Sequence, residues 1–139
     1  MRTEPLGLQV TGGRLEPDDN ASPGRRLAEV LTTAVLTYED EASLHLAIAK
    51  TLEEGGIEHE HEVRLDARSR LDFLTADGVG VEVKIAGQAA GVTRQLLRYA
   101  HHQEVHELVL VTTQADHHLI PTELAGKPVH VCWLAGQGL

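Results

Sequence analysis

Residues 70–85 read Arg-Leu-Asp-Phe-Leu-Thr-Ala-Asp-Gly-Val-Gly-Val-Glu-Val-Lys-Ile, two apolar runs joined by a turn. Apolar side chains alternate with other residues in each run, which indicates two strands that bury one face. If residues 76–78 form a short loop, Phe73 lies opposite Val81 in the resulting hairpin. This register predicts that six apolar side chains share the buried face: Leu71, Phe73, Val79, Val81, Val83 and Ile85.

The same register places three charged residues on the opposite face. Asp72 lies directly opposite Glu82, and Lys84 follows one pleat further along. Cross-strand neighbours come within roughly 5 Å of each other, where two like charges repel. A cation between the two carboxylates relieves this repulsion, and Asp and Glu oxygens suit a hard divalent ion. The hairpin therefore predicts a metal site.

A tighter turn is the alternative for this hairpin. Asp77-Gly78 fits the two central positions of a type I′ turn. That turn would pair Phe73 with Glu82 and divide the apolar side chains between two faces, so burial favours the longer loop. For the charged residues, the alternative is a solvated strand face with a salt bridge.

Composition limits the class of protein. A chain of 139 residues, 42% of them hydrophobic, fits one compact domain that buries a core without disulfides. Aromatic residues make up 3%, so the core must be aliphatic. No apolar run approaches the length of a membrane span, and the polar N-terminus lacks a signal-peptide core. The single cysteine, Cys132, excludes an internal disulfide, and we expect a cytoplasmic protein without membrane contact.

The net charge of −9 counts against a nucleic-acid partner when the chain is taken as a whole. Residues 1–61 contain 12 acidic and 5 basic side chains, and residues 103–139 contain 4 and 1. Residues 62–102, which include the hairpin, contain 5 acidic and 6 basic side chains. Bound metal would neutralise some of those acids, which leaves a locally positive surface that suits DNA.

Outward from the hairpin, the sequence predicts a mixed α/β domain. Residues 1–36 are expected to form an N-terminal appendage, with a short hairpin near residues 8–15 and a helix that starts at Ser22-Pro23. A strand over residues 30–37 is the alternative to the second part of that helix. Residues 37–139 are expected to form the core, in the order α-β-β-β-α-β plus a final strand. Outside the hairpin, the core elements are expected at residues 40–54 (helix), 57–65 (strand), 87–102 (helix), 107–113 (central strand) and 128–134 (strand).

Asp72, the sequence Glu82-Val83-Lys84 and the order of the surrounding elements resemble the core of the PD-(D/E)XK nuclease superfamily. This superfamily includes many restriction enzymes, archaeal-type Holliday junction resolvases and phage exonucleases. For roughly residues 37–115, the resemblance implies a restriction-endonuclease-like mixed sheet flanked by helices. The proline that names the motif is absent, since Leu71 precedes Asp72, and the superfamily varies at this position.

The resemblance also implies a ligand set and a reaction. Asp72 and Glu82 would bind Mg²⁺ or Mn²⁺, together with the main-chain carbonyl of Val83. The metal would polarise the phosphate and lower the pKa of a bound water. Lys84 would hold or deprotonate the attacking water, or neutralise charge on the phosphorane.

The two neighbouring helices add further candidates. The resemblance implies a carboxylate on the helix before the hairpin as a metal ligand, for which we choose Glu41, with Glu39 and Asp40 as alternatives. On the helix after the hairpin, Gln95 resembles the glutamine that some branches use to bind metal-bound water or to orient the lysine. The candidate contacts to DNA phosphates are Arg70, Arg94 and Arg98.

The 9 histidines raise the question of a zinc site. His59 and His61 share a strand face, but the sequence has no HExxH helix and no CxxC pair. We therefore expect the histidines at surface positions rather than in a transition-metal site.

These observations predict a Mg²⁺- or Mn²⁺-dependent DNA nuclease that hydrolyses phosphodiester bonds. So short a chain lacks a separate sequence-reading domain, and we expect selectivity for DNA structure or ends. Cutting of duplex or branched DNA would favour a homodimer, because two-fold symmetry presents two sites to two strands. The alternative is a non-catalytic nucleic-acid-binding or protein-interaction module on the same fold, which the negative net charge favours.

Overall fold

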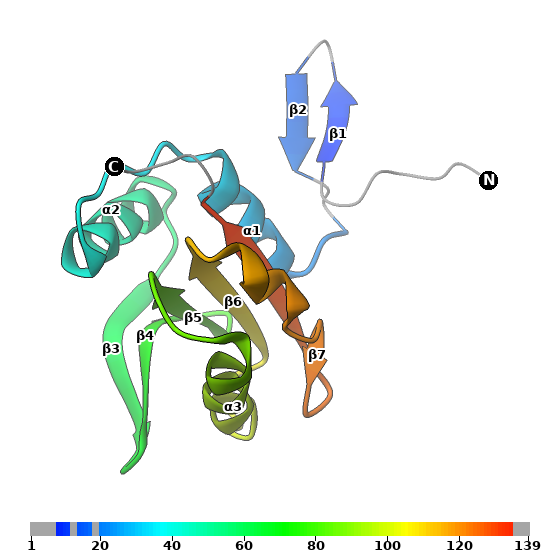
Figure 1. Ribbon diagram of the computed structural model, residues 1–139. Coiled ribbons are helices and arrows are strands. Elements are labelled where there is room, and N and C mark those ends of the chain that lie inside the picture. The colour runs from blue at the N-terminus through cyan, green and yellow to red at the C-terminus, as the bar shows by residue number, and fades with distance from the viewer. Residues whose placement is uncertain (1–7, 12–13, 18–19, 135–139) are drawn as a thin grey trace.

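Residues 8–11, 14–17 and 20–134 are described by the structure, a computed structural model with a mixed α/β fold (Figure 1). The strands of its main sheet are β3 (His59–Asp66), β4 (Ser69–Thr75), β5 (Val79–Lys84), β6 (Glu107–Thr112), β7 (Glu123–Leu124) and β8 (Lys127–Trp133). Their order in the sheet is β3-β4-β5-β6-β8-β7. β3, β4 and β5 form an antiparallel meander, and β5, β6 and β8 run parallel.

Helices cover both faces of this sheet (Figure 1). They are α1 (Pro23–Thr33), α2 (Glu41–Glu54), α3 (Ala89–Ala100) and the short 3₁₀ helix η1 (Ala115–Leu119). α1 and α2 pack on one face, in a core that includes Phe73 and Val109. α3 packs on the other face, in a core that includes Leu96 and Leu108. The predicted α/β class and element order are confirmed. The loop or short helix expected after the central strand is η1, and β7 is an addition. The restriction-endonuclease-like assignment stays a prediction.

The hairpin of β4 and β5 has the register that its apolar pattern predicts. Phe73 pairs with Val81, so the longer loop is confirmed and the type I′ alternative is wrong. Gly78 closes the turn with a φ of +84°, a conformation that favours glycine. A Cβ at this position would also lie 2.5 Å from the His106 ring. Both the backbone conformation and the lack of space therefore require glycine.

Leu71 departs from the predicted face. It is fully buried, but it packs in the core beneath α3 rather than with Phe73. The β4–β5 ladder ends at Phe73 and Val81. Before that pair, β4 stays paired with β3 but no longer with β5. The Tyr99 hydroxyl of α3 donates a hydrogen bond to the Arg70 carbonyl, which ties this part of β4 to α3. The prediction of six apolar side chains on one face is therefore wrong for Leu71.

β6 is the central strand that its apolar run predicts. All of its residues are buried, and it runs parallel to β5 on one side and to β8 on the other. A strand in this position is covered on both faces, which is why its sequence is continuously apolar rather than alternating.

The helix boundaries follow from capping residues. The Ser22 hydroxyl accepts the Arg25 N–H at the start of α1, and Pro23 is the first helical residue. α1 continues to Thr33, so the helix is confirmed over the alternative strand. Asp40 caps α2 by accepting the Ser43 N–H at 2.8 Å.

α1 packs into the core although it is predicted within the N-terminal appendage. Its Leu27 and Leu31 are 4% and 0% exposed and belong to the same core as the residues of α2. The hairpin β1 (Leu8–Thr11) and β2 (Arg14–Pro17) precedes α1, in agreement with the hairpin expected near residues 8–15. Among the described helices, none combines the length and the apolar character that crossing a membrane requires.

A buried carboxylate at the start of β6 fixes α1 to the sheet. Glu107 accepts three hydrogen bonds, from the Ser22 hydroxyl at 2.7 Å, the Gly24 N–H at 3.0 Å and His130 Nε2 at 2.9 Å. A Cβ on Gly24 would lie 2.6 Å from the Glu107 carboxylate, so this close approach requires glycine. Burial opposes the ionisation of Glu107, but the hydrogen bonds outweigh burial and lower its pKa.

We expect Glu107→Ala to lower the free energy of unfolding near neutral pH by about 2–4 kcal/mol, because it leaves buried donors unpaired. Since the folded-state pKa of Glu107 is lowered, its ionised form stabilises the fold above the unfolded-state pKa. That contribution is lost as the pH falls through the folded-state pKa. Urea unfolding near pH 7 and near pH 3 should therefore show a gap between wild type and variant that narrows in acid.

The matched control is Glu104→Ala, which removes an exposed carboxylate nearby. Its unfolding free energy should stay within about 0.5 kcal/mol of the wild-type value. A gap for Glu107→Ala that is the same at both pH values would show that the ionised carboxylate is not the source of the stabilisation.

Candidate metal centre

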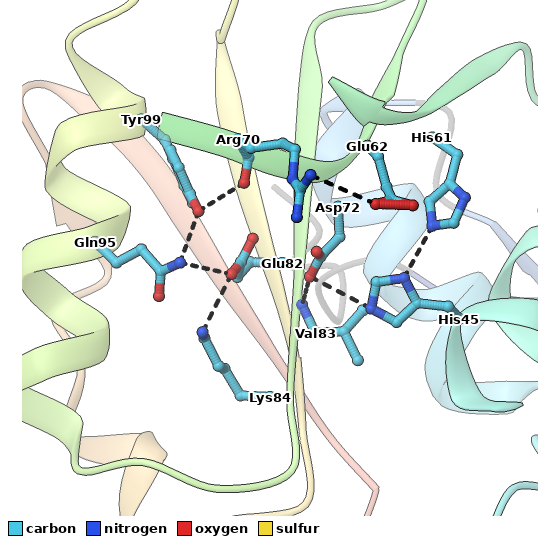
Figure 2. Close-up of polar contacts among 10 residues, drawn as sticks. All are labelled: His45, His61, Glu62, Arg70, Asp72, Glu82, Val83, Lys84, Gln95 and Tyr99. Atoms are coloured by element: carbon cyan, nitrogen blue, oxygen red, sulfur yellow. Dashed lines mark hydrogen bonds and ion pairs between the residues drawn. The ribbon is translucent and has the colours of Figure 1, made fainter. Parts of the chain in front are cut away.

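The predicted charged residues lie where β4 and β5 separate (Figure 2). Beyond the last paired residues of the ladder, the Asp72 carboxylate accepts a hydrogen bond of 2.7 Å from the Val83 N–H. A side chain thereby replaces the β4 main chain as the partner of Val83. Because the N–H and C=O of one strand residue point to the same side, the Val83 carbonyl is expected on the side of β5 that faces β4. The end of the ladder thus places the Asp72 carboxylate against the main chain of Val83.

Glu82 is the buried carboxylate of this cluster, with 3% of the residue exposed. Its Oε2 atom accepts a hydrogen bond of 2.9 Å from Gln95 Nε2 and lies 3.3 Å from Lys84 Nζ (Figure 2). Its Oε1 atom is buried and has no hydrogen-bond partner. An unpartnered carboxylate oxygen in a buried position is costly, so this atom calls for a cation or a donor.

The charges of the cluster do not balance. The pKa of Glu82 is raised to about 8, first by burial and second by the negative charge of Asp72. Lys84 lowers the pKa of Glu82 but does not offset these two effects. A divalent cation beside both carboxylates would satisfy the unpartnered oxygen and relieve the repulsion, and hard oxygen donors are what Mg²⁺ and Mn²⁺ prefer.

Gln95 and Tyr99 support Glu82 from α3. The Gln95 side-chain amide donates to Glu82 and lies 2.7 Å from the Tyr99 hydroxyl, which in turn donates to the Arg70 carbonyl at 2.9 Å (Figure 2). Burial and then the nearby Glu82 charge raise the pKa of Tyr99, so its hydroxyl stays protonated as a donor. Gln95 therefore lies where the sequence predicts a site residue. Tyr99 is an additional one, whose signal is its position one turn after Gln95.

The residue of α2 that approaches the cluster is His45. Its Nε2 atom lies 3.7 Å from Asp72 Oδ2, and its Nδ1 atom lies 2.9 Å from His61 Nε2 (Figure 2). The His61 ring stacks on Phe73, with ring centroids 4.6 Å apart. His45 is therefore packed beside Asp72, which the sequence does not predict, whereas His61 is exposed, as expected for a surface histidine.

Glu41, the predicted helix ligand, lies at the first residue of α2 and is exposed. Glu39 is exposed as well, and Asp40 is occupied as the helix cap, with a pKa lowered by the Ser43 N–H. Within the described residues, no three His, Cys, Asp or Glu side chains converge as a preformed metal site. The structure thus brings together Asp72 and Glu82, but it does not bring Glu41 to them.

The predicted DNA contacts have different surroundings. The Arg70 guanidinium is exposed and lies 3.8 Å from Glu62, whose φ of +56° belongs to the left-handed region (Figure 2). Such a φ is uncommon for a residue other than glycine, and Glu62 has no partner in the β3–β4 register. Arg94 is exposed on α3. Arg98 is partly buried, and its Nε atom has no hydrogen-bond partner.

No family model, curated protein or solved structure matches this chain. Membership of the PD-(D/E)XK superfamily therefore stays a proposal. Its support is the resemblance of the hairpin and the geometry of the residues themselves.

Proposed function

We propose that this protein is a divalent-metal-dependent DNA nuclease of the PD-(D/E)XK type, which hydrolyses phosphodiester bonds. The observation that carries the proposal is the buried Glu82 carboxylate with an unpartnered oxygen, next to the charges of Asp72 and Lys84. A solvated strand face with a simple salt bridge would leave Glu82 exposed, whereas it is 3% exposed. Asp72, Glu82 and the Val83 carbonyl would hold Mg²⁺ or Mn²⁺.

The residues around this position suit phosphodiester hydrolysis. The bound ion supplies a Lewis acid for the phosphate and lowers the pKa of a water molecule. The Lys84 side chain is 25% exposed, so its ammonium reaches both Glu82 and the solvent from which a phosphate would approach. There it can neutralise charge that develops on the phosphate oxygens or orient the attacking water. Gln95 fixes the orientation of Glu82 from α3.

The direct test is a panel of labelled DNA substrates, single-stranded, duplex and branched, with an RNA strand beside them. Each is incubated with Mg²⁺, with Mn²⁺ or with chelator, and the products are separated on a denaturing gel. We expect cleavage of at least one DNA form that requires the metal. Equal cleavage in chelator would contradict the proposal, and the panel also shows whether DNA structure or ends determine selectivity.

A second candidate function is a non-catalytic DNA-binding module on the same fold. The net charge of −9 and the exposed position of Glu41 favour it. Calorimetric binding of Mn²⁺ without turnover of any substrate in the panel would support this second function. The first proposal includes a homodimer only if the substrate is one in which both strands are cut. Light scattering with and without DNA measures the oligomeric state.

We expect His45→Ala to weaken Mn²⁺ binding and DNA cleavage by about tenfold or more, because residues that orient metal ligands typically contribute this much. His45 lies beside Asp72, and its loss frees that carboxylate. Glu41→Ala is the matched variant on the same helix, and it should leave both quantities within about twofold, since it removes only a favourable charge at a helix start. Calorimetry and initial cleavage rates measure the two effects. The reverse order of effects would return the helix ligand to Glu41.

A further inference from the structure

A second polar cleft lies further along α3 than the candidate metal centre. It opens between the β3–β4 turn and the C-terminal end of α3, with a volume of about 510 Å³. The ionisable side chains in its lining are Asp66, Arg68, Arg98, His101 and His102. Four basic side chains thus stand against one carboxylate.

Arg98 brings a buried donor without a partner to this cleft. Its Nε atom is buried and makes no hydrogen bond within the described residues. On the β4 side, the buried Ser69 hydroxyl also makes no hydrogen bond, although it lies near enough to Asp66 to help lower the pKa of that carboxyl. A buried donor on a charged group costs free energy when it has no acceptor. Arg98 lines the cleft and is only partly buried, so an anion in the cleft can supply an acceptor to its guanidinium.

The carboxylate in the lining is already paired. Asp66 accepts the Arg68 N–H at 2.7 Å and lies 2.7 Å from His102 Nε2, and the first of these contacts is the main reason for its lowered pKa. Glu104 lies 3.9 Å from His102, and the C-terminus of α3 adds a partial negative charge. Within the lining itself, the two arginines outnumber the single carboxylate, so its formal charge is positive.

We propose that this cleft binds a phosphate group of the DNA strand that is cut. The guanidinium groups of Arg68 and Arg98 match the oxygens of a phosphate. Arg98 lies one helical turn after Gln95, and His102, just beyond the end of α3, lies about two turns after Gln95. These spacings correspond to about 5–10 Å along the helix axis. For a DNA strand that runs along α3 with a rise of about 3.4 Å per nucleotide, this separation places the bound phosphate about two or three nucleotides from the scissile bond. This inference rests on the proposed nuclease function for the position of the cut.

Arg98→Gln tests the cleft without turnover. DNA binding is measured by fluorescence anisotropy in chelator over a range of salt concentrations. We expect binding about tenfold weaker than wild type and a log–log salt slope smaller by about 0.7–0.9, the value for one phosphate contact. Arg98→Lys restores the charge and should recover part of the binding. Lys50→Gln removes a charge from α2, on the opposite face of the sheet, and should change neither quantity.

Circular dichroism and thermal unfolding establish that these variants fold. Unchanged binding and salt slope in folded Arg98→Gln would overturn the proposal. An equal loss in Lys50→Gln would overturn it too, because the effect would then be one of total charge. A rise in the melting temperature with inorganic phosphate that Arg98→Gln abolishes, while DNA binding stays unchanged, would assign the cleft to free phosphate instead of DNA.

Substrates shortened one nucleotide at a time on either side of the cut locate the phosphate. Wild-type kcat/KM should drop stepwise when the second or third nucleotide is removed from one side, and Arg98→Gln should lack this step. Cleavage with the same length dependence in both proteins overturns the cleft while the nuclease function stands. Absence of cleavage by wild type, with weaker DNA binding by Arg98→Gln, supports the cleft and removes the nuclease function.

Discussion

Lys84→Ala should reduce metal-dependent DNA cleavage by about 10²–10³-fold, the typical cost of one group that stabilises charge in a transition state. The Lys84 ammonium lies 3.3 Å from Glu82 and is the basic group that Glu82 contacts within the described chain. Its removal leaves in place Asp72 and Glu82, the two carboxylates proposed to bind the metal. Calorimetric Mn²⁺ binding should therefore persist, while initial cleavage rates collapse.

Lys50→Ala is the matched control for this prediction, since it truncates an exposed lysine on α2. It should keep the wild-type rate. Full activity of Lys84→Ala would exclude this ammonium from the reaction, although the metal-dependent cleavage itself would stand. Circular dichroism shows whether Lys84→Ala still folds. If it does not, Lys84→Arg tests catalysis in its place. That variant restores the charge and should recover part of the rate if charge stabilisation is its role.

The parts of the fold that could be predicted are those in which local pattern and burial agree. The alternation of Phe73 and Val81 with polar neighbours determines the hairpin register, because the other turn would expose half of the apolar side chains. The continuous apolar run of β6 predicts a strand covered on both faces, and the capping residue Ser22 with Pro23 after it predicts a helix start. Each of these inferences needs only neighbours in the sequence or across one hairpin.

The parts that could not be predicted depend on contacts between distant elements. His45 meets Asp72 because of the way α2 lies over the sheet, and no spacing in the sequence encodes that approach. The same holds for Leu71, which packs with the residues of α3 because the β4–β5 ladder ends before it. Glu41 is predicted because the superfamily resemblance implies a carboxylate on this helix, and Glu41 is an acidic residue at its start. Which turn of a helix faces a site is determined by packing, and here the turn that contains His45 does so.

Glu82→Gln should abolish metal-dependent cleavage and yet stabilise the metal-free protein in alkaline solution. The wild-type carboxyl has a folded-state pKa raised to about 8, above its ordinary value of 4.5, so the folded state binds more protons than the unfolded state between these values. Stability from this group is therefore complete in acid and is lost as the pH rises through about 8. Glutamine carries no charge at any of these pH values and avoids the loss.

Thermal unfolding near pH 6 and near pH 9 in chelator measures this effect, with an expected gain of about 5 °C for the variant at the higher pH and a smaller difference at the lower one. Glu54→Gln makes the same change at an exposed end of α2 and should show no such dependence. Excess Mn²⁺ should raise the melting temperature of wild type but not of Glu82→Gln, because only a carboxylate that binds the ion couples it to folding. Equal stabilisation of both proteins by Mn²⁺ would place the ion elsewhere. Stabilisation of the wild type by Mn²⁺ would mean that Glu82 lowers the stability of the metal-free protein and raises that of the metal-bound protein. This is the pattern expected where selection favours a metal-dependent reaction over stability.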